Sequence, residues 1–144
     1  MLPQDTLRIE TEFGITLPEG YVAFMASYPK ELEETYTDYG ATKEYICDRE
    51  FLKSSERLIE INRNVRSYAH WPTATGQWPN HLWVVGDDQC GNYYAIDTTN
   101  SEAPAYYFDH GDGTFEEFSK DVREFSDWAI ESALDFNAMY DERA

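Results

Sequence analysis

Hydrophobic residues recur with a helical period near the amino terminus and again after residue 50. Residues 4–13 predict a short amphipathic helix that ends at Gly14, because glycine readily adopts the backbone conformation that closes a helix. A second helix is predicted over residues 18–28, with Pro18 as its first residue, since an N–H at that position would have no partner. The same spacing over residues 51–69 predicts a third helix.

Between and after these helices the pattern changes. Residues 30–50 are acidic and predict a loop with one or two short strands. Residues 71–80 combine two prolines, a glycine and two tryptophans, a composition typical of a loop. Three strands are predicted near residues 81–86, 92–97 and 105–109, and their short connections favour antiparallel neighbours.

Residues 82–97 are the most informative part of the chain. Two strand-like runs flank a turn built from Gly86, Asp87, Asp88 and Gly91. This arrangement predicts a β-hairpin whose turn carries carboxylates and whose strands carry bulky aromatic side chains.

The last predicted element is a long helix. Thr114 and Glu117 have the spacing of a capping box at its start. One face of the helix is then formed by Phe115, Phe118, Val122, Phe125, Ala129, Ser132 and Phe136, while most acidic residues lie off this face. Together the elements predict a single domain over residues 1–144 that combines two short N-terminal helices, antiparallel strands and one long C-terminal helix.

The net charge of the chain indicates which kinds of macromolecule it can bind. The chain has 28 acidic and 11 basic residues, a formal net charge of −17, and no Lys or Arg between Arg66 and Lys120. Residues 67–144 hold 15 acids and 3 bases, whereas residues 1–66 hold 13 acids and 8 bases. Nucleic acid and anionic membranes are poor partners for such a chain, because binding phosphate requires cations. A basic protein would be attracted, although high charge can also serve solubility alone.

No motif in the sequence supports catalysis or a cofactor. Cys47, Cys90, His70, His81 and His110 lack the paired spacing of a metal site. Nothing around Cys90 is electropositive, so nothing favours a reactive thiolate there. Only two cysteines, no secretory signal and no apolar run of membrane-spanning length favour a reducing cytoplasm. We therefore expect no metal, no cofactor and no enzymatic activity.

Four segments, in this order and spacing, resemble one known family. They are a helix–Gly–apolar–Pro–helix segment at residues 9–21, a strand–Gly–acid–Gly–strand hairpin at 82–97, a strand with a terminal acid at 105–110, and an aromatic-rich segment at 115–118. The chain resembles the SUKH superfamily, which includes fungal Smi/Knr cell-wall regulators and many bacterial immunity proteins. Residues 29–80 contribute none of the segments that carry this resemblance.

The resemblance implies an α+β domain in which an antiparallel β-sheet is flanked by helices. It also implies that the domain binds and neutralises a toxin domain, often a nuclease, and that the family has no common catalytic residues. An acidic binder can occupy the basic cleft of a nuclease in place of nucleic acid. We expect the contacts to be strand-end carboxylates and aromatic anchors, namely Asp87, Asp88, Asp109, Asp112, Tyr94, Tyr107, Trp71 and Trp78. Each also has a structural explanation: the aspartates shape turns, the tyrosines face the core and the tryptophans fix the loop.

Two other hypotheses stay open. The chain could be a regulatory scaffold like the fungal relatives, without a toxin partner, or an enzyme or small-ligand binder that uses the concave face of the sheet. A neighbouring gene for a large secreted protein with a basic C-terminal domain would favour the immunity hypothesis. A deep apolar pocket with a few converging polar groups would favour ligand binding. The oligomeric state is expected to be a monomer or a weak homodimer.

Overall fold

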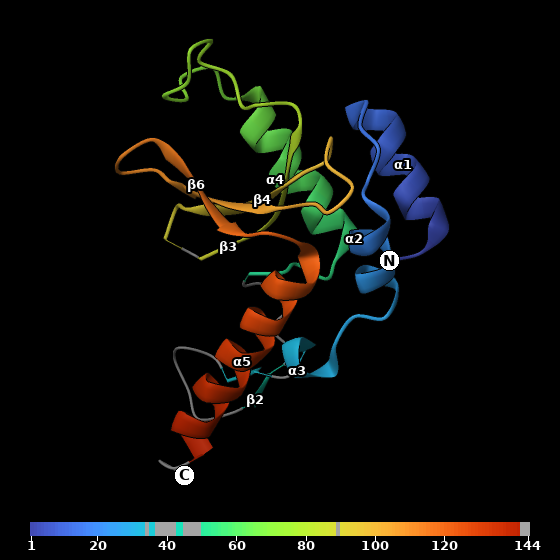
Figure 1. Ribbon diagram of the computed structural model, residues 1–144, viewed down its shortest axis with the longest axis vertical. Coiled ribbons are helices and arrows are strands. Elements are labelled where there is room, and N and C mark those ends of the chain that lie inside the picture. Colours follow the sequence, from blue (N-terminus) through green and yellow to red (C-terminus); the bar gives the residue numbers. More distant parts are fainter. Residues whose placement is uncertain (34, 37–42, 45–49, 89, 142–144) are drawn as a thin grey trace.

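A four-stranded antiparallel sheet lies at the centre of the structure, a computed structural model that describes residues 1–33, 35–36, 43–44, 50–88 and 90–141 (Figure 1). In chain order the elements are α1 (Pro3–Phe13), α2 (Glu19–Ala26), α3 (Lys30–Glu33), β1 (Thr35–Tyr36), β2 (Lys43–Glu44), α4 (Ser55–Ser67), β3 (Leu82–Asp87), β4 (Tyr93–Asp97), β5 (Ala105–Asp109), β6 (Thr114–Ser119) and α5 (Val122–Asp141). The predicted α+β class and antiparallel sheet flanked by helices are confirmed.

The central sheet is a meander with the strand order β3-β4-β5-β6, in which each strand pairs with its neighbour in the sequence. The three strands predicted from the alternating pattern are β3, β4 and β5, within one or two residues at each end. A register shift between Val84 and Gly86 lies in β3, and Val84 and Val85 are both buried, one in each hydrophobic cluster. The sheet therefore buries apolar side chains on both of its faces.

Residues 114–119 form the strand β6, so the predicted helix start and capping box at Thr114 and Glu117 are wrong. Phe115 and Phe118 are three residues apart, which places them on one side of a helix but on opposite faces of a strand. Phe115 contacts Phe108 on one face of the sheet, and Phe118 contacts Phe125 on the other. Because the sheet is buried on both faces, the same spacing is satisfied by a strand.

The long C-terminal helix begins later than predicted, at Val122. The carboxylate of Asp121 accepts a hydrogen bond from the backbone N–H of Glu124 at 2.8 Å and so caps the helix. From Val122 onward the predicted apolar face is confirmed, because Val122, Phe125 and Ala129 are buried.

The N-terminal helices follow the prediction closely. α1 ends at Gly14, whose φ of 65° is the left-handed conformation that favours glycine. Pro18 is the residue before α2 rather than its first helical residue. The third predicted helix, α4, begins at Ser55 instead of residue 51, because the hydroxyl of Ser54 caps it by accepting from the N–H of Arg57.

The acidic segment 30–50 is described only in part. It contains two short strands, β1 and β2, as the sequence predicts, and the structure pairs them antiparallel. Residues 30–33 form the short helix α3, where the sequence predicts a loop. α3 and β1 pack against α5, as Figure 1 shows below the central sheet. The rest of the prediction for this segment, and Cys47, lie outside the described residues.

The two faces of the sheet are covered differently. Trp83, Val85, Tyr94 and Ile96 pack with side chains of α1, α2 and α5 in the larger hydrophobic cluster. On the opposite face the smaller cluster contains Val65, Trp78, Leu82, Val84, Ala95 and Phe108, so residues 68–81, a segment without helix or strand, cover that face. None of the described helices combines the length and the apolar character needed to cross a bilayer.

Two side chains of α4 hydrogen-bond to the edge strand β3: Arg66 donates to the carbonyl oxygen of Leu82, and Asn62, which is fully buried, bonds to both backbone groups of Val84. The amide nitrogen of Asn62 donates to the carbonyl oxygen of Val84 at 2.9 Å, and its amide oxygen accepts from the N–H of Val84 at 2.9 Å. The same oxygen accepts from the guanidinium of Arg66 at 2.7 Å. Asn62 thus satisfies backbone groups of an edge strand that would otherwise be buried without partners.

Replacing Asn62 with Leu should lower the free energy of unfolding by about 3 kcal/mol, because buried groups of Val84 and Arg66 lose their hydrogen bonds. Denaturant unfolding measures this as a lower midpoint with an unchanged slope. The control is Asn64→Leu on the same helix, where the side chain is exposed and the change should stay within about 0.5 kcal/mol. Equal losses in the two variants would contradict the role of Asn62.

Candidate partner-binding site at the turn end of the sheet

The strand register brings two acidic turns to the same end of the sheet. Asp87 lies in the row that continues through Tyr93, Phe108 and Phe115 on the next three strands. The β3–β4 and β5–β6 turns both follow this row, and they lie on the same side of the sheet in Figure 1. The turns contain the four predicted aspartates Asp87, Asp88, Asp109 and Asp112.

Asp88 shapes the β3–β4 turn. One carboxylate oxygen accepts from the backbone N–H of Cys90 at 2.8 Å and of Asn92 at 3.2 Å, and the other accepts from the Asn92 side chain at 2.7 Å. The hydroxyl of Tyr107 also donates to Asp88, at 2.8 Å. Partial burial acts to raise the pKa of Asp88, but these hydrogen bonds outweigh it and hold the pKa below its ordinary value of 3.8.

Asp109 shapes the β5–β6 turn in a similar way, because its carboxylate accepts from the backbone N–H of Gly111 at 2.7 Å. Asp112 is exposed in the same turn, and Asp87 is half-buried at the end of β3. The charge of Asp87 reaches its neighbour on β4: burial and then this negative charge raise the pKa of Tyr93. Of the four carboxylates, Asp112 is thus the one with an exposed side chain.

A hydrogen-bonded chain connects the two turns. The side-chain oxygen of Asn92 accepts from the backbone N–H of His110 at 3.0 Å and lies 2.6 Å from ring Nδ1 of the same residue. Since that oxygen can only accept, we assign a ring proton to Nδ1, so that Nε2 is an acceptor when the ring is neutral. The amide group of Asn92 is itself oriented by its bond to Asp88. The position of His110 is therefore fixed by the opposite turn.

Trp71 and Trp78 belong to an aromatic cluster with Tyr93, Phe108 and Phe115, with ring centroids 4.8–6.4 Å apart. Both indole N–H groups donate to backbone carbonyls, that of Trp71 to Val65 at 2.6 Å and that of Trp78 to Leu82 at 2.8 Å. Trp78 is buried, with 4% of its surface exposed, and Trp71 is half-buried.

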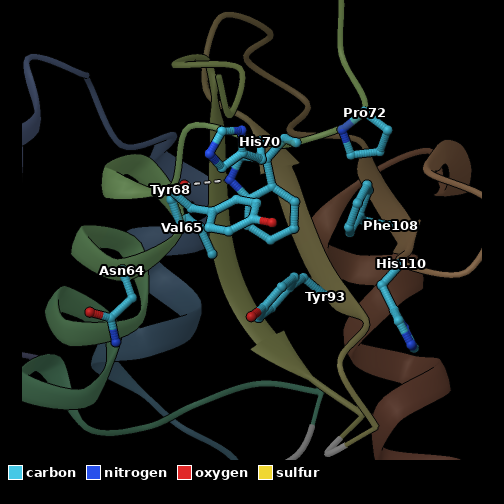
Figure 2. A pocket seen from close by; sticks show the side chains of 9 residues that line it. Asn64, Val65, Tyr68, His70, Pro72, Tyr93, Phe108 and His110 are labelled. Carbon is cyan, nitrogen blue, oxygen red and sulfur yellow. Dashed lines mark hydrogen bonds between the residues drawn. The ribbon is translucent and has the colours of Figure 1, made fainter. Parts of the chain in front are cut away.

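A pocket of about 380 Å³ opens beside this cluster. Figure 2 shows it between the end of α4, residues 68–72 and the strands β4 and β5. It is lined by Asn64, Val65, Tyr68, His70, Trp71, Pro72, Tyr93, Phe108 and His110. Among these residues none is Lys, Arg, Asp or Glu, and we call this hollow the Trp71 pocket.

The two predicted tyrosines lie on the other face of the sheet. Tyr94, 7% exposed, packs against Phe125 and Trp128 in the larger cluster. The Tyr107 ring contacts Tyr94, but its hydroxyl reaches the β3–β4 turn. Burial, the hydrogen bond to Asp88 and the negative charges of Asp88 and Asp109 raise the pKa of Tyr107 to about 12.

The structure therefore places five of the eight predicted residues at one end of the sheet: Asp87, Asp88, Asp109, Asp112 and Trp71. Trp78 and Tyr94 lie in the interior and support that end from the two faces. Sequence reasoning missed Tyr68, Tyr93, Asn92 and the pocket-lining role of His110. Their only sequence signal is proximity to the ends of predicted helices and strands, because their meeting depends on register and on the path of residues 68–80.

Three basic residues in the first half of the chain form ion pairs with acidic residues of the same half. Arg8 pairs with Glu56 at 2.6 Å, and bidentate pairing joins Arg63 to Glu12, which connects α1 with α4. Lys53 pairs with Glu33. Other acids of the second half, namely Glu124, Asp127, Glu131 and Asp135, lie exposed along α5, away from the sheet turns. The acidic residues thus form more than one group.

Comparison with known proteins gives one match. Residues 2–128 match the family model described as SMI1 / KNR4 family (SUKH-1), which includes the whole sheet, both acidic turns and the Trp71 pocket. No curated protein and no solved structure matches the chain.

Gly113 in the β5–β6 turn should not tolerate a side chain. Its φ is 68°, and a Cβ there would overlap the ring of Pro72, which lines the Trp71 pocket. We expect Gly113→Ala to lower the free energy of unfolding by about 2 kcal/mol. Gly20→Ala in α2 is the control, because nothing lies near its Cβ position, and it should leave stability unchanged or raise it by about 1 kcal/mol. Calorimetry of both variants decides; equal effects would contradict the contact.

Asp88→Asn should destabilise the fold in a pH-dependent way. The folded-state pKa of Asp88 is lowered, so its contribution is present above pH 3.8 and is lost as the pH falls through the folded-state value. We expect a loss of about 1 kcal/mol at neutral pH that disappears in strong acid. Unfolding curves across this range, with Asp112→Asn as control, measure the difference. A difference that stays constant down to the lowest usable pH would contradict this assignment.

Proposed function

The chain belongs to the SMI1 / KNR4 family (SUKH-1), and from that premise we propose that it is an immunity-type protein. It binds a basic toxin domain of the nuclease type and neutralises it without catalysing a reaction. The family supports a role in protein–protein interaction, and the partner's basic character is inferred from the charge of this chain. The protein is proposed to act in the cytoplasm as a monomer or weak homodimer, and to bind neither nucleic acid nor membranes.

The observation that carries the proposal is the meeting of Asp87, Asp88, Asp109 and Asp112 at one end of the sheet. No Lys or Arg occurs in the sequence between Arg66 and Lys120, which includes both of these turns. The ion pairs of Arg8, Lys53 and Arg63 are made with acids of the first half of the chain. The carboxylates gathered at the sheet end give it a negative field that would attract a cationic partner.

To neutralise a nuclease, the protein needs only to occupy the cleft that binds nucleic acid. A nuclease must hold polyphosphate in a cleft lined by Lys and Arg. An acidic surface of matching shape takes the place of that substrate, and long-range attraction accelerates the encounter. This mechanism predicts tight binding at low ionic strength and weaker, slower association in salt.

The residues of the sheet end have different proposed roles. Asp87, Asp109 and Asp112 contact the partner's cations, and Trp71 provides an aromatic contact beside them. Asp88 and Tyr107 hold the turn in shape, since their side chains bond to each other. The burial of Trp78 and Tyr94 supports a contribution from beneath the surface rather than direct contact.

The test is co-purification with the last domain of the protein encoded by the adjacent reading frame, followed by variants of single carboxylates. Asp112→Lys should weaken binding about tenfold at low ionic strength, with a smaller difference in salt, because it reverses a charge at the contact. Asp112 is chosen because its side chain is exposed, whereas that of Asp88 holds its turn. The matched control is Glu131→Lys, an equal charge reversal on exposed α5, which should change affinity little.

Two outcomes would overturn the proposal. If the adjacent domain does not bind at all, the regulatory-scaffold alternative is favoured. If Asp112→Lys and Glu131→Lys weaken binding equally, the contact is not at the sheet end and only net charge matters.

A further inference from the structure

The Trp71 pocket has the size for one long side chain. Its volume of about 380 Å³ is near the lower limit of ligand sites. Its walls are the rings of Tyr68, Trp71, Tyr93 and Phe108, which come from three separate parts of the chain (Figure 2). Aromatic faces carry negative electrostatic potential and attract cations.

Several side chains of the lining carry hydrogen-bond acceptors. They are the hydroxyl of Tyr93, the side-chain oxygen of Asn64 and, when the His110 ring is neutral, its Nε2, because the hydrogen bond to Asn92 places the ring proton on Nδ1. Ammonium and guanidinium groups donate and cannot accept, so these acceptors can bind them.

The electrostatic surroundings point the same way. Asp87 acts on Tyr93 in the lining, where its charge contributes to the raised pKa of that tyrosine. Asp109 precedes His110 at the end of β5. No described residue of the lining is Lys or Arg.

The nearest basic residue in the sequence, Arg66, is directed elsewhere. Its guanidinium lies over the rings of Phe13 and Trp83 and donates to the carbonyl oxygens of Asn80 and Leu82. Burial lowers its pKa only to about 10, so it remains a cation at neutral pH, but one that is engaged with the edge of β3. It therefore does not occupy the pocket itself.

The pocket is also held in shape without a ligand. The indole of Trp71 is fixed by its bond to Val65, and His110 by its bonds to Asn92. Pro72 packs against Gly113 so closely that no side chain fits between them. A pre-formed site avoids the entropy of ordering its walls when the ligand enters.

From these observations we propose that the Trp71 pocket is a receptor for a single Arg or Lys side chain of the basic partner, held by cation–π contact and by the acceptors of the lining. This inference rests on the proposed function and specifies it, because it assigns a defined socket beside the acidic turns. The aspartates attract the partner over distance, and the pocket fixes one of its cations.

The test uses side-chain probes and the intact protein. N-acetyl-arginine N-methylamide is titrated against the NMR signals of the Trp71 indole N–H and the His110 ring, with N-acetyl-citrulline N-methylamide as an uncharged probe of the same shape. We expect saturable shifts with a millimolar Kd for the arginine probe and none for citrulline. N-acetyl-lysine N-methylamide should bind to the same signals.

A variant identifies the aromatic contribution. Tyr68→Leu keeps an apolar side chain at an exposed position and should weaken arginine binding about threefold. Phe118→Leu is the control, an equal change at an exposed aromatic residue that does not line the pocket. An unchanged indole N–H signal of the buried Trp78 in the free variants shows that the loop is still in place.

Each other result overturns the inference. Equal NMR shifts with the citrulline probe would show that the pocket does not require a positive charge in its ligand. If neither probe shifts the signals, the pocket does not bind a cationic side chain. Equal weakening by Tyr68→Leu and Phe118→Leu would remove the aromatic contribution. If the arginine probe does not bind but the adjacent toxin domain still co-purifies, the pocket proposal is wrong and the proposed function stands. If the probe binds but no basic protein partner is found, the pocket binds a cation and the proposed function is wrong.

Discussion

The pairing of Asn62 with the backbone of Val84 is the constraint on which the rest of the structure depends. β3 is an edge strand, and a buried edge without partners would cost several unsatisfied hydrogen bonds. One amide side chain supplies both a donor and an acceptor, so it acts as a short substitute for a further strand. It also fixes α4 in position and angle relative to the sheet. The chain that leaves α4 can then cross the second face of the sheet, where Trp71 and Trp78 bury their rings.

Two basic residues of α4 are directed toward α1 and the edge of β3. The guanidinium of Arg66 follows the edge of β3, and Arg63 pairs with Glu12 on α1. These cations are thereby committed to the first half of the fold, where they connect elements. The β-turns at the far end of the sheet lie in the stretch between Arg66 and Lys120, in which the sequence has no Lys or Arg. The proposed binding surface therefore lies in a part of the chain that contributes acidic residues and no Lys or Arg.

At the turn end of the sheet, carboxylates that shape the turns also belong to the proposed binding surface. Asp88 and Asp109 accept backbone N–H groups and so define the shape of their turns. Their charges are held in fixed positions, as pre-organised recognition requires. Asn92 extends this order to His110 in the neighbouring turn. Asp87 is the register partner of Tyr93, and Asp109 directly precedes His110, so acidic residues adjoin two residues that line the Trp71 pocket.

The local pattern of the sequence determined the elements that depend on near neighbours: the end of α1 at Gly14, the β3–β4 hairpin, the antiparallel sheet and the apolar face of α5. These follow from the conformational preference of glycine, from turn chemistry and from periodicity, which act within a few residues. The family resemblance from separate motifs was confirmed by the match over residues 2–128. Tertiary structure alone decided that residues 114–119 form a strand, because the i, i+3 spacing of Phe115 and Phe118 suits either a helix or a sheet buried on both faces. It also decided that Asn62 satisfies β3 and that Tyr68, Trp71, Tyr93 and His110 enclose one pocket. Those contacts join residues far apart in the chain, and their geometry is set by register and packing, which no local pattern contains.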